Sequence, residues 1–179
     1  SQTYYLIIDL EATCSNDGSI PPTEMEIIEI GAVLQHAQSF EIQDEFQTFV
    51  RPVRHPHLTP FCRQLTSITQ DQVDQAPDFP TALARFRDWF APYDICFASW
   101  GAYDRKQFLQ DCTFHSLPYP FPPDHLNVKA AFSQHRGTRQ RYGLGQALKK
   151  LGLSFQGTPH RGIDDAHNIA RIIRTVLQG

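Results

Sequence analysis

Two acids interrupt an apolar run near the start of the chain. Residues 4–8 are aromatic or aliphatic, as a buried strand requires; Asp9 follows directly and Glu11 comes two residues later. Because alternate residues of a strand point to the same face, the two carboxylates project side by side. Adjacent buried carboxylates are costly, and a cation with oxygen ligands, Mg²⁺ or Mn²⁺, would compensate. A strand end in solvent would instead leave both acids hydrated, so the pair alone leaves both interpretations open.

Two more acids open the last apolar segment, residues 163–177, where the periodicity predicts a helix. Asp165 falls on the apolar stripe with Ile169, Ile172, Ile173 and Val176, whereas Asp164 falls on the polar face with Asn168, Arg171 and Thr175. We therefore expect Asp165 to point into the protein. Asp164 fits the ordinary role of an acid at a helix N-terminus, where it offsets the helix dipole.

A histidine and a further acid lie near similar element ends. His160 stands in a Pro- and Gly-rich loop five residues before Asp165, where it could act as a general base near neutral pH or be an ordinary surface histidine. Asp104 follows a predicted strand and opens a predicted helix, on the same face as Phe108. It could lean inward like Asp165, or serve only the helix dipole.

The elements that must position these residues are those of an α/β domain. Apolar and β-branched runs predict strands at residues 4–10, 26–34, 46–50 and 94–99, and helices are predicted at 79–90, 103–112, 143–151 and 163–177. Residues 114–125 hold four prolines and are predicted to form a loop. Three strands followed by alternating helices and strands indicate a mixed sheet. Because element ends converge on one edge of such a sheet, the four acids would meet there.

Four converging carboxylates would suit two divalent ions about 3.5–4 Å apart. Such a pair activates a water and stabilises the leaving oxygen in phosphodiester hydrolysis, and a loop histidine beside it would take the proton of that water. The combination of Asp9, Glu11, Asp104, Asp165 and His160 therefore predicts a metal-dependent nuclease, which none of these residues does alone.

The composition bounds the class of protein. The chain has 179 residues, 41% of them hydrophobic, and we expect one domain over residues 1–179. The net charge of −3 means that nucleic-acid binding must come from metal ions or a local patch. One basic stretch, with His135, Arg136, Arg139 and Arg141, could touch phosphates or be a solvated loop. No Cys-x-x-Cys pair and no run long enough to span a membrane is found, so we expect free thiols and a cytoplasmic protein.

The five residues also match a known family. An Asp-x-Glu pair near the start, a middle Asp and a His-x-x-x-x-Asp before the last helix resemble the motifs of DEDDh 3′→5′ exonucleases, the DnaQ-like branch of the ribonuclease H-like fold. The strings IIDLEATC, EIIEIGAVL, LTPFCRQLTSITQDQVDQAP and HRGIDDAHNIARII look like the subgroup that trims histone messenger RNA ends and small RNAs in animals. The resemblance covers nearly the whole chain and implies a mixed five-stranded sheet flanked by helices.

The resemblance also implies a role for each residue. Asp9 would bridge two Mg²⁺ or Mn²⁺ ions, Glu11 and Asp165 would complete the first ion site, and Asp104 would hold the second ion. His160 would be the general base. Further positions match those that handle the 3′-terminal nucleotide in relatives: the backbone of Ala12 and Thr13 near the sugar, and the side chains of Phe61, Leu65, Thr66 and Tyr103. Phe61 could equally be a core residue.

We therefore expect a monomeric 3′→5′ exonuclease that releases nucleoside 5′-monophosphates from the ends of single-stranded RNA. Two alternatives stay open: a DNA 3′→5′ exonuclease, and a non-catalytic nucleic-acid-binding module that kept the fold. The intact five residues argue against the module, because a decayed site would usually lose one of them. Contacts to the 2′-hydroxyl would decide between RNA and DNA, and the resemblance favours RNA.

Overall fold

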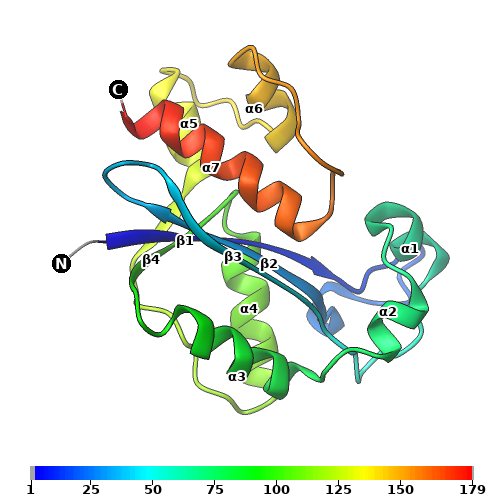
Figure 1. Cartoon of the computed structure of the whole chain (residues 1–179). Coiled ribbons are helices and arrows are strands. Elements are labelled where there is room, and N and C mark those ends of the chain that lie inside the picture. Colours follow the sequence, from blue (N-terminus) through cyan, green and yellow to red (C-terminus); the bar gives the residue numbers. More distant parts are fainter. Residues whose placement is uncertain (1–2, 179) are drawn as a thin grey trace.

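A five-stranded sheet with helices on both faces forms the structure (Figure 1). The computed structural model describes residues 3–178. The strands are β1 (Thr3–Ala12), β2 (Ile27–His36), β3 (Ile42–Phe49), β4 (Asp94–Ser99) and β5 (His125–Asn127). The helices are the 3-10 turn η1 (Pro22–Glu24), α1 (Pro60–Thr66), α2 (Gln70–Asp74), α3 (Phe79–Phe90), α4 (Tyr103–Phe114), α5 (Val128–His135), α6 (Leu144–Lys150) and α7 (Gly162–Gln178).

The sheet is mixed, as the sequence predicts. Its strand order is β3-β2-β1-β4-β5. The first three strands form an antiparallel meander, while β4 pairs parallel to β1 and β5 pairs parallel to β4. β1 therefore lies at the centre, with the meander on one side and the parallel strands on the other. Its carboxyl end, which carries Asp9 and Glu11, pairs with β2 on one side and extends beyond Ile7, the last residue that pairs with β4, on the other.

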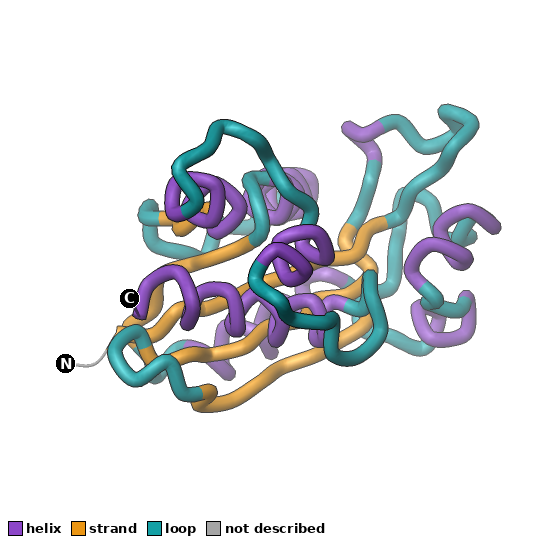
Figure 2. The backbone as a smooth tube through the Cα atoms, turned by 90° about the horizontal axis from the view of Figure 1, so that it is seen from above, coloured by secondary structure: helices purple, strands orange, loops and turns teal. Residues whose placement is uncertain are grey.

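Each face of the sheet has its own core. Leu6, Ile8 and Leu10 pack with α3 and α4 on one face, whereas Ile7 packs with α5, α6 and α7 on the other. Because side chains alternate along a strand, Asp9 and Glu11 project to the same face as Ile7, beneath α7. Figure 2 shows α7, the helix that ends at the C-terminus, lying over the strands on this face. The alternation alone thus places both acids under the helix that carries Asp165.

Most predicted elements are confirmed. The helix at 79–90 and the strand at 94–99 match to the residue, and the strand predicted at 46–50 begins four residues earlier, at Ile42. Four elements, α1, α2, α5 and β5, were not predicted from the sequence. These helices are eight residues long or shorter, too short for a clear apolar period, and they begin at polar caps. Thr59 accepts the Cys62 N–H at 3.0 Å, and Asn127 accepts the Ala130 N–H at 3.0 Å.

Two glycines let β2 and α7 approach backbone to backbone. A Cβ on Gly31 of β2 would lie 2.1 Å from the carbonyl carbon of Gly162. A Cβ on Gly162, the first residue of α7, would lie 2.8 Å from the carbonyl oxygen of Asp9. Since Asp9 pairs with Gly31 in the sheet, this contact holds the start of α7 directly against the acid-bearing part of β1.

We expect Gly31→Ala to destabilise the fold by about 2 kcal/mol or more, because the clashing atoms belong to the backbone and cannot move aside cheaply. Urea unfolding of the variant and the wild type measures the loss. Gly145→Ala is the matched control, since a Cβ there meets nothing within 4 Å and alanine favours a helix. Equal free energies of unfolding for the two variants would contradict the proposed contact.

Candidate active site

One cleft gathers all five residues that the sequence analysis assigns to chemistry. Asp9, Glu11, Asp104, His160 and Asp165 line a cleft of about 620 Å³. The remaining walls are formed by Leu10, Trp100, Tyr103, Gly143, Leu144, Gly145, Gln146, Phe155 and Pro159. The acids come from β1 and from the first turns of α4 and α7, and the histidine comes from the loop that enters α7.

The two helix-borne acids point inward. Asp104 is 3% exposed, and its Oδ1 accepts the backbone N–H of Leu10 at 2.9 Å, which ties α4 to β1. Asp165 is 8% exposed and lines the cleft. Its neighbour Asp164 turns away and accepts the Thr158 N–H at 2.9 Å. The predicted inward and outward directions of Asp165 and Asp164 therefore agree with the structure.

Burial and mutual repulsion perturb the acids strongly. Burial, followed by the charges of Asp165 and other acids, raises the pKa of Glu11 to about 9. Burial raises the pKa of Asp104 to about 7 even though the Leu10 N–H opposes the shift. The pKa of Asp9 is raised well above its usual value by burial and by Asp104, Asp165 and Glu11. Without a cation, Glu11 and Asp104 would be at least partly protonated near neutral pH.

Acids buried elsewhere in the fold receive hydrogen bonds that Asp9 and Glu11 lack among the described residues. Glu26 accepts the backbone N–H groups of three residues, 53–55, and Glu29 accepts the Gly162 N–H at 2.8 Å and the Gln47 side chain at 2.9 Å. Within residues 3–178, no N–H group donates to the carboxylates of Asp9 or Glu11, and no Lys or Arg pairs with them. The pair is thus a set of oxygen ligands that still needs positive charge.

The donor set fits a divalent cation. Ligand atoms of Glu11, His160 and Asp165 lie within 4.8 Å of one another, and the Asp9 carboxyl hydrogen-bonds that of Asp165. Hard divalent ions such as Mg²⁺ take carboxylate oxygens of this kind. Asp9, Glu11, Asp104 and Asp165 would therefore hold such ions, while His160 stands at the exposed rim.

Glu29 is a positioning residue that the sequence analysis did not single out. It is 0% exposed, lies opposite Glu11 in the sheet, and holds the Gly162 N–H as well as the Arg161 guanidinium at 3.3 Å. These bonds fix the chain directly after His160, whose φ of 64° is unusual for a residue other than glycine. An acid inside an apolar strand was the available signal, the same one that marks Asp9.

The predicted substrate residues are placed less uniformly. Tyr103 lines the cleft and is 45% exposed, as base stacking would require. Thr13 is buried, and its hydroxyl accepts the Glu26 N–H at 2.9 Å. The Thr66 hydroxyl is also buried, donating to the Cys62 carbonyl and accepting the Ile68 N–H. Ala12 is buried at the end of β1, and the half-buried Phe61 and the exposed Leu65 lie on α1.

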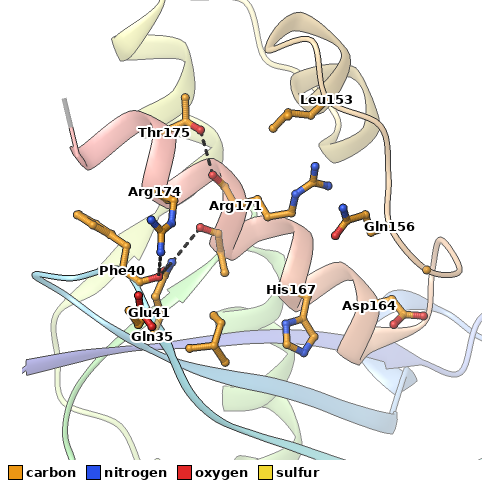
Figure 3. A pocket seen from close by; sticks show the side chains of 13 residues that line it. Gln35, Phe40, Glu41, Leu153, Gln156, Asp164, His167, Arg171, Arg174 and Thr175 are labelled. Atoms are coloured by element: carbon orange, nitrogen blue, oxygen red, sulfur yellow. Dashed lines mark hydrogen bonds between the residues drawn. The ribbon is translucent and has the colours of Figure 1, made fainter.

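A hollow of comparable size on the far side of α7 lacks such chemistry (Figure 3). Its basic side chains are already engaged: Arg174 donates to the Phe40 carbonyl at 3.0 Å, Arg171 donates to the Ser154 carbonyl at 2.8 Å, and His167 hydrogen-bonds Glu45. The unpaired carboxylates mark the other cleft as the candidate active site.

Comparison with known proteins agrees with this geometry. The model of the RNase_T exonuclease family matches residues 6–173. The chain belongs to the RNase_T exonuclease family. Among its RNase_T relatives, human 3′-5′ exoribonuclease 1 is 39% identical over 184 residues, which cover 98% of this chain and 52% of the human protein. The chain spans about half the length of the curated relatives it matches.

Solved structures of the family agree in fold. The nuclease domain of 3′hExo, a DEDDh family member bound to rAMP, has a TM-score of 0.89 at 38% identity, covering 98% of this chain and 92% of that one. A structure described as 3′-end specific recognition of histone mRNA stem-loop by 3′-exonuclease has a TM-score of 0.90 at 37% identity, covering 98% and 64%. The predicted DEDDh family and ribonuclease H-like fold are confirmed, and the family implies divalent metal ions.

No helix among the described residues combines the length and apolarity needed to cross a membrane.

The raised pKa values predict how pH affects the metal-free protein. A group whose folded pKa is raised stabilises the fold fully below its unfolded pKa, and that stabilisation is lost as pH rises through the folded pKa. For Asp104 the loss runs from about 4 to about 7, and for Glu11 it extends to about 9. We therefore expect the metal-free protein to melt several degrees lower at pH 9 than at pH 6, as each kcal/mol is worth about 2–4 °C.

Thermal melts in a chelator across this pH range measure the effect. Added Mg²⁺ should raise the melting temperature more at pH 9 than at pH 6, because the carboxylates are then ionised ligands. Asp104→Asn keeps an oxygen that can accept the Leu10 N–H and should flatten the pH dependence between 6 and 7. A melting temperature that is independent of pH, or a Mg²⁺ effect equal at both ends, would contradict the assignment.

Proposed function

We propose that this chain is a 3′→5′ exoribonuclease that uses two Mg²⁺ or Mn²⁺ ions and acts on single-stranded ends. The observation that carries the proposal is the convergence of five side chains, four of them acids, on one cleft. The match of the family model over residues 6–173 supports the reaction class, since converging carboxylates that hold divalent ions serve metal-assisted hydrolysis. A relative named an exoribonuclease and a similar structure bound to rAMP support RNA as the substrate.

The residues divide the work by position. Asp9, Glu11, Asp104 and Asp165 would hold the ions, which when bound offset the negative charge on the attacking and leaving oxygens. His160 would take the proton of the attacking water at a ring nitrogen, since it is exposed at the rim and its neighbours Arg161 and Gly162 are fixed by Glu29. Attack by water on the terminal phosphorus breaks its bond to the 3′ oxygen.

The products follow from that bond. The released residue keeps the phosphate and leaves as a nucleoside 5′-monophosphate, while the shortened strand keeps a 3′-hydroxyl ready for the next cycle. Tyr103 at the mouth of the cleft would stack on a terminal base, a contact that tolerates any sequence and contributes about 1–3 kcal/mol per base. We further propose that the protein acts as a monomer, since one chain supplies all five side chains of the cleft.

We expect Asp9→Ala to lower the rate of hydrolysis at least about 1,000-fold, since a metal ligand is lost together with its charge. The assay follows 5′-labelled single-stranded RNA with Mg²⁺ or Mn²⁺ and resolves the ladder of shortened strands. Asp164→Asn is the control: this acid adjoins Asp165 in sequence, turns away from the cleft, and keeps an acceptor for Thr158. Equal rates for the wild type and Asp9→Ala would overturn the proposal. Faster cleavage of DNA of the same sequence would identify DNA, rather than RNA, as the preferred substrate.

His160→Ala should abolish most hydrolysis yet leave the binding of Mn²⁺ unchanged, because a general base moves a proton without holding the ion. Calorimetric titration with Mn²⁺ separates the two roles, and the rate should fall by about 100- to 10,000-fold. Loss of Mn²⁺ binding together with activity would instead make His160 a ligand, which its place within 4.8 Å of the Glu11 and Asp165 oxygens would permit geometrically.

A further inference from the structure

Charge is divided very unevenly along the chain. Residues 125–163 hold seven Lys and Arg and no acid, although the whole chain has 16 Lys and Arg against 19 Asp and Glu. The remaining residues therefore carry a net charge of −10. A 39-residue segment without a single acid is not accounted for by the chemistry of the cleft, which uses only His160 from it.

Six of these cations form a continuous stretch of the fold, here called the basic tract: Lys129, Arg136, Arg139, Arg141, Lys149 and Lys150. The tract covers α5, the loop 136–143 and α6, on the face of the sheet that also carries α7 (Figure 1). Five of the six are exposed, and Lys129 is half-buried. Arg139 and Arg141 line an open hollow of about 630 Å³ together with Gly137, Thr138, Gln134 and Ala130, and no acid lines it.

Among the described residues, no acid forms an ion pair with these cations. Within the described part of the chain, ion pairs join His55 to Glu24, Arg161 to Glu29 and His167 to Glu45, and none includes a residue of the tract. The Arg136 guanidinium lies 5.9 Å from the Phe132 ring centre, and the Lys150 ammonium lies 5.9 Å from that of Tyr142. The charged groups of Arg136 and Lys150 thus lie near aromatic rings at the surface, and these contacts do not neutralise their positive charge.

The tract leads directly to the mouth of the cleft. Arg141 is two residues before Gly143. Gly143 is the N-cap of α6 and the first of the residues at the start of α6 that line the cleft. The indole N–H of Trp100, which also lines the cleft, donates to the Tyr142 carbonyl at 3.0 Å, so the residue next to Arg141 is tied to the cleft wall. Lys129 passes beside Gly101, where an added Cβ would lie 3.6 Å from Lys129 Cδ.

We propose that the basic tract binds the phosphate backbone of the RNA strand upstream of the nucleotide being removed. This inference rests on the proposed function and extends it, because the substrate is then a strand of several nucleotides, gripped outside the cleft. The acid-lined cleft repels a polyanion, and an adjacent run of unpaired cations supplies the attraction that a protein of net charge −3 otherwise lacks. Contacts of this kind position the strand without reading its sequence.

The test is the double variant Arg139→Glu/Arg141→Glu, whose two positions are exposed loop residues outside the cleft. The matched control is Arg85→Glu/Arg87→Glu, with the same spacing and charge change on exposed positions of α3, across the sheet. Both variants are assayed on a 20-nucleotide RNA and on a diribonucleoside monophosphate. The latter is too short to extend from the cleft to the basic tract. Fluorescence anisotropy measures binding of the labelled 20-mer in EDTA.

We expect the tract variant to raise KM for the 20-mer at least about tenfold, with kcat and dinucleotide hydrolysis unchanged, while the control stays near wild type. The slope of log affinity against log salt concentration should become less negative by about 1.4 in the tract variant, or about 0.7 for each lost phosphate contact. Equal increases in KM for the two variants would show that only the net charge matters. That result would overturn the proposal that the basic tract binds the strand. Loss of dinucleotide hydrolysis in the tract variant alone would also overturn it.

The same experiments distinguish a failure of the proposed nuclease function from a failure of the proposed RNA binding by the tract. If the wild type hydrolyses neither substrate, the nuclease assignment fails, while the anisotropy still decides whether the tract binds RNA. Unchanged anisotropy in the tract variant overturns the tract whatever the activity.

Discussion

The close backbone contact between β2 and the start of α7 governs the geometry of the cleft. Gly31 and Gly162 approach so closely that a side chain on either would collide with main-chain atoms. The contact brings the first turn of α7 over β1, so that Asp165 meets Asp9, although 156 positions separate them in the sequence. Glu29 secures the same junction by accepting the Gly162 N–H. A helix start set one turn away would scatter the ligands.

That junction holds together groups that repel one another. The fold gathers four carboxylates in one cleft, with Asp104 and Asp165 buried and Asp9 and Glu11 half-buried, and it raises their pKa values. Among the described residues, Asp9 and Glu11 lack the N–H donors that the fold gives to Glu26 and Glu29. A protein tolerates such a cost when the site has a use for it, and divalent ions convert the repulsion into attraction. The unpaired cations of the basic tract complement this arrangement, since they draw in a polyanion that the acids alone would repel.

Much of the site could be predicted from the sequence because it depends on local periodicity. Alternation along β1 put Asp9 and Glu11 on one face, and the helical period turned Asp165 inward and Asp164 outward, as the structure has them. The family resemblance supplied the functional class. The role of Glu29 could not be predicted, because it depends on a contact with Gly162, 133 residues away. Helices α1, α2 and α5 were missed since their caps, unlike long apolar stripes, are signals of only a few residues.

The central claim is that the cleft acids are metal ligands. Anomalous diffraction from crystals grown with Mn²⁺ and a nucleoside 5′-monophosphate tests it most directly. The account predicts two manganese peaks inside the cleft, with Asp9 bound to both, Glu11 and Asp165 at one and Asp104 at the other. Manganese found only outside the cleft, or a cleft in which the four acids bind none, would contradict it.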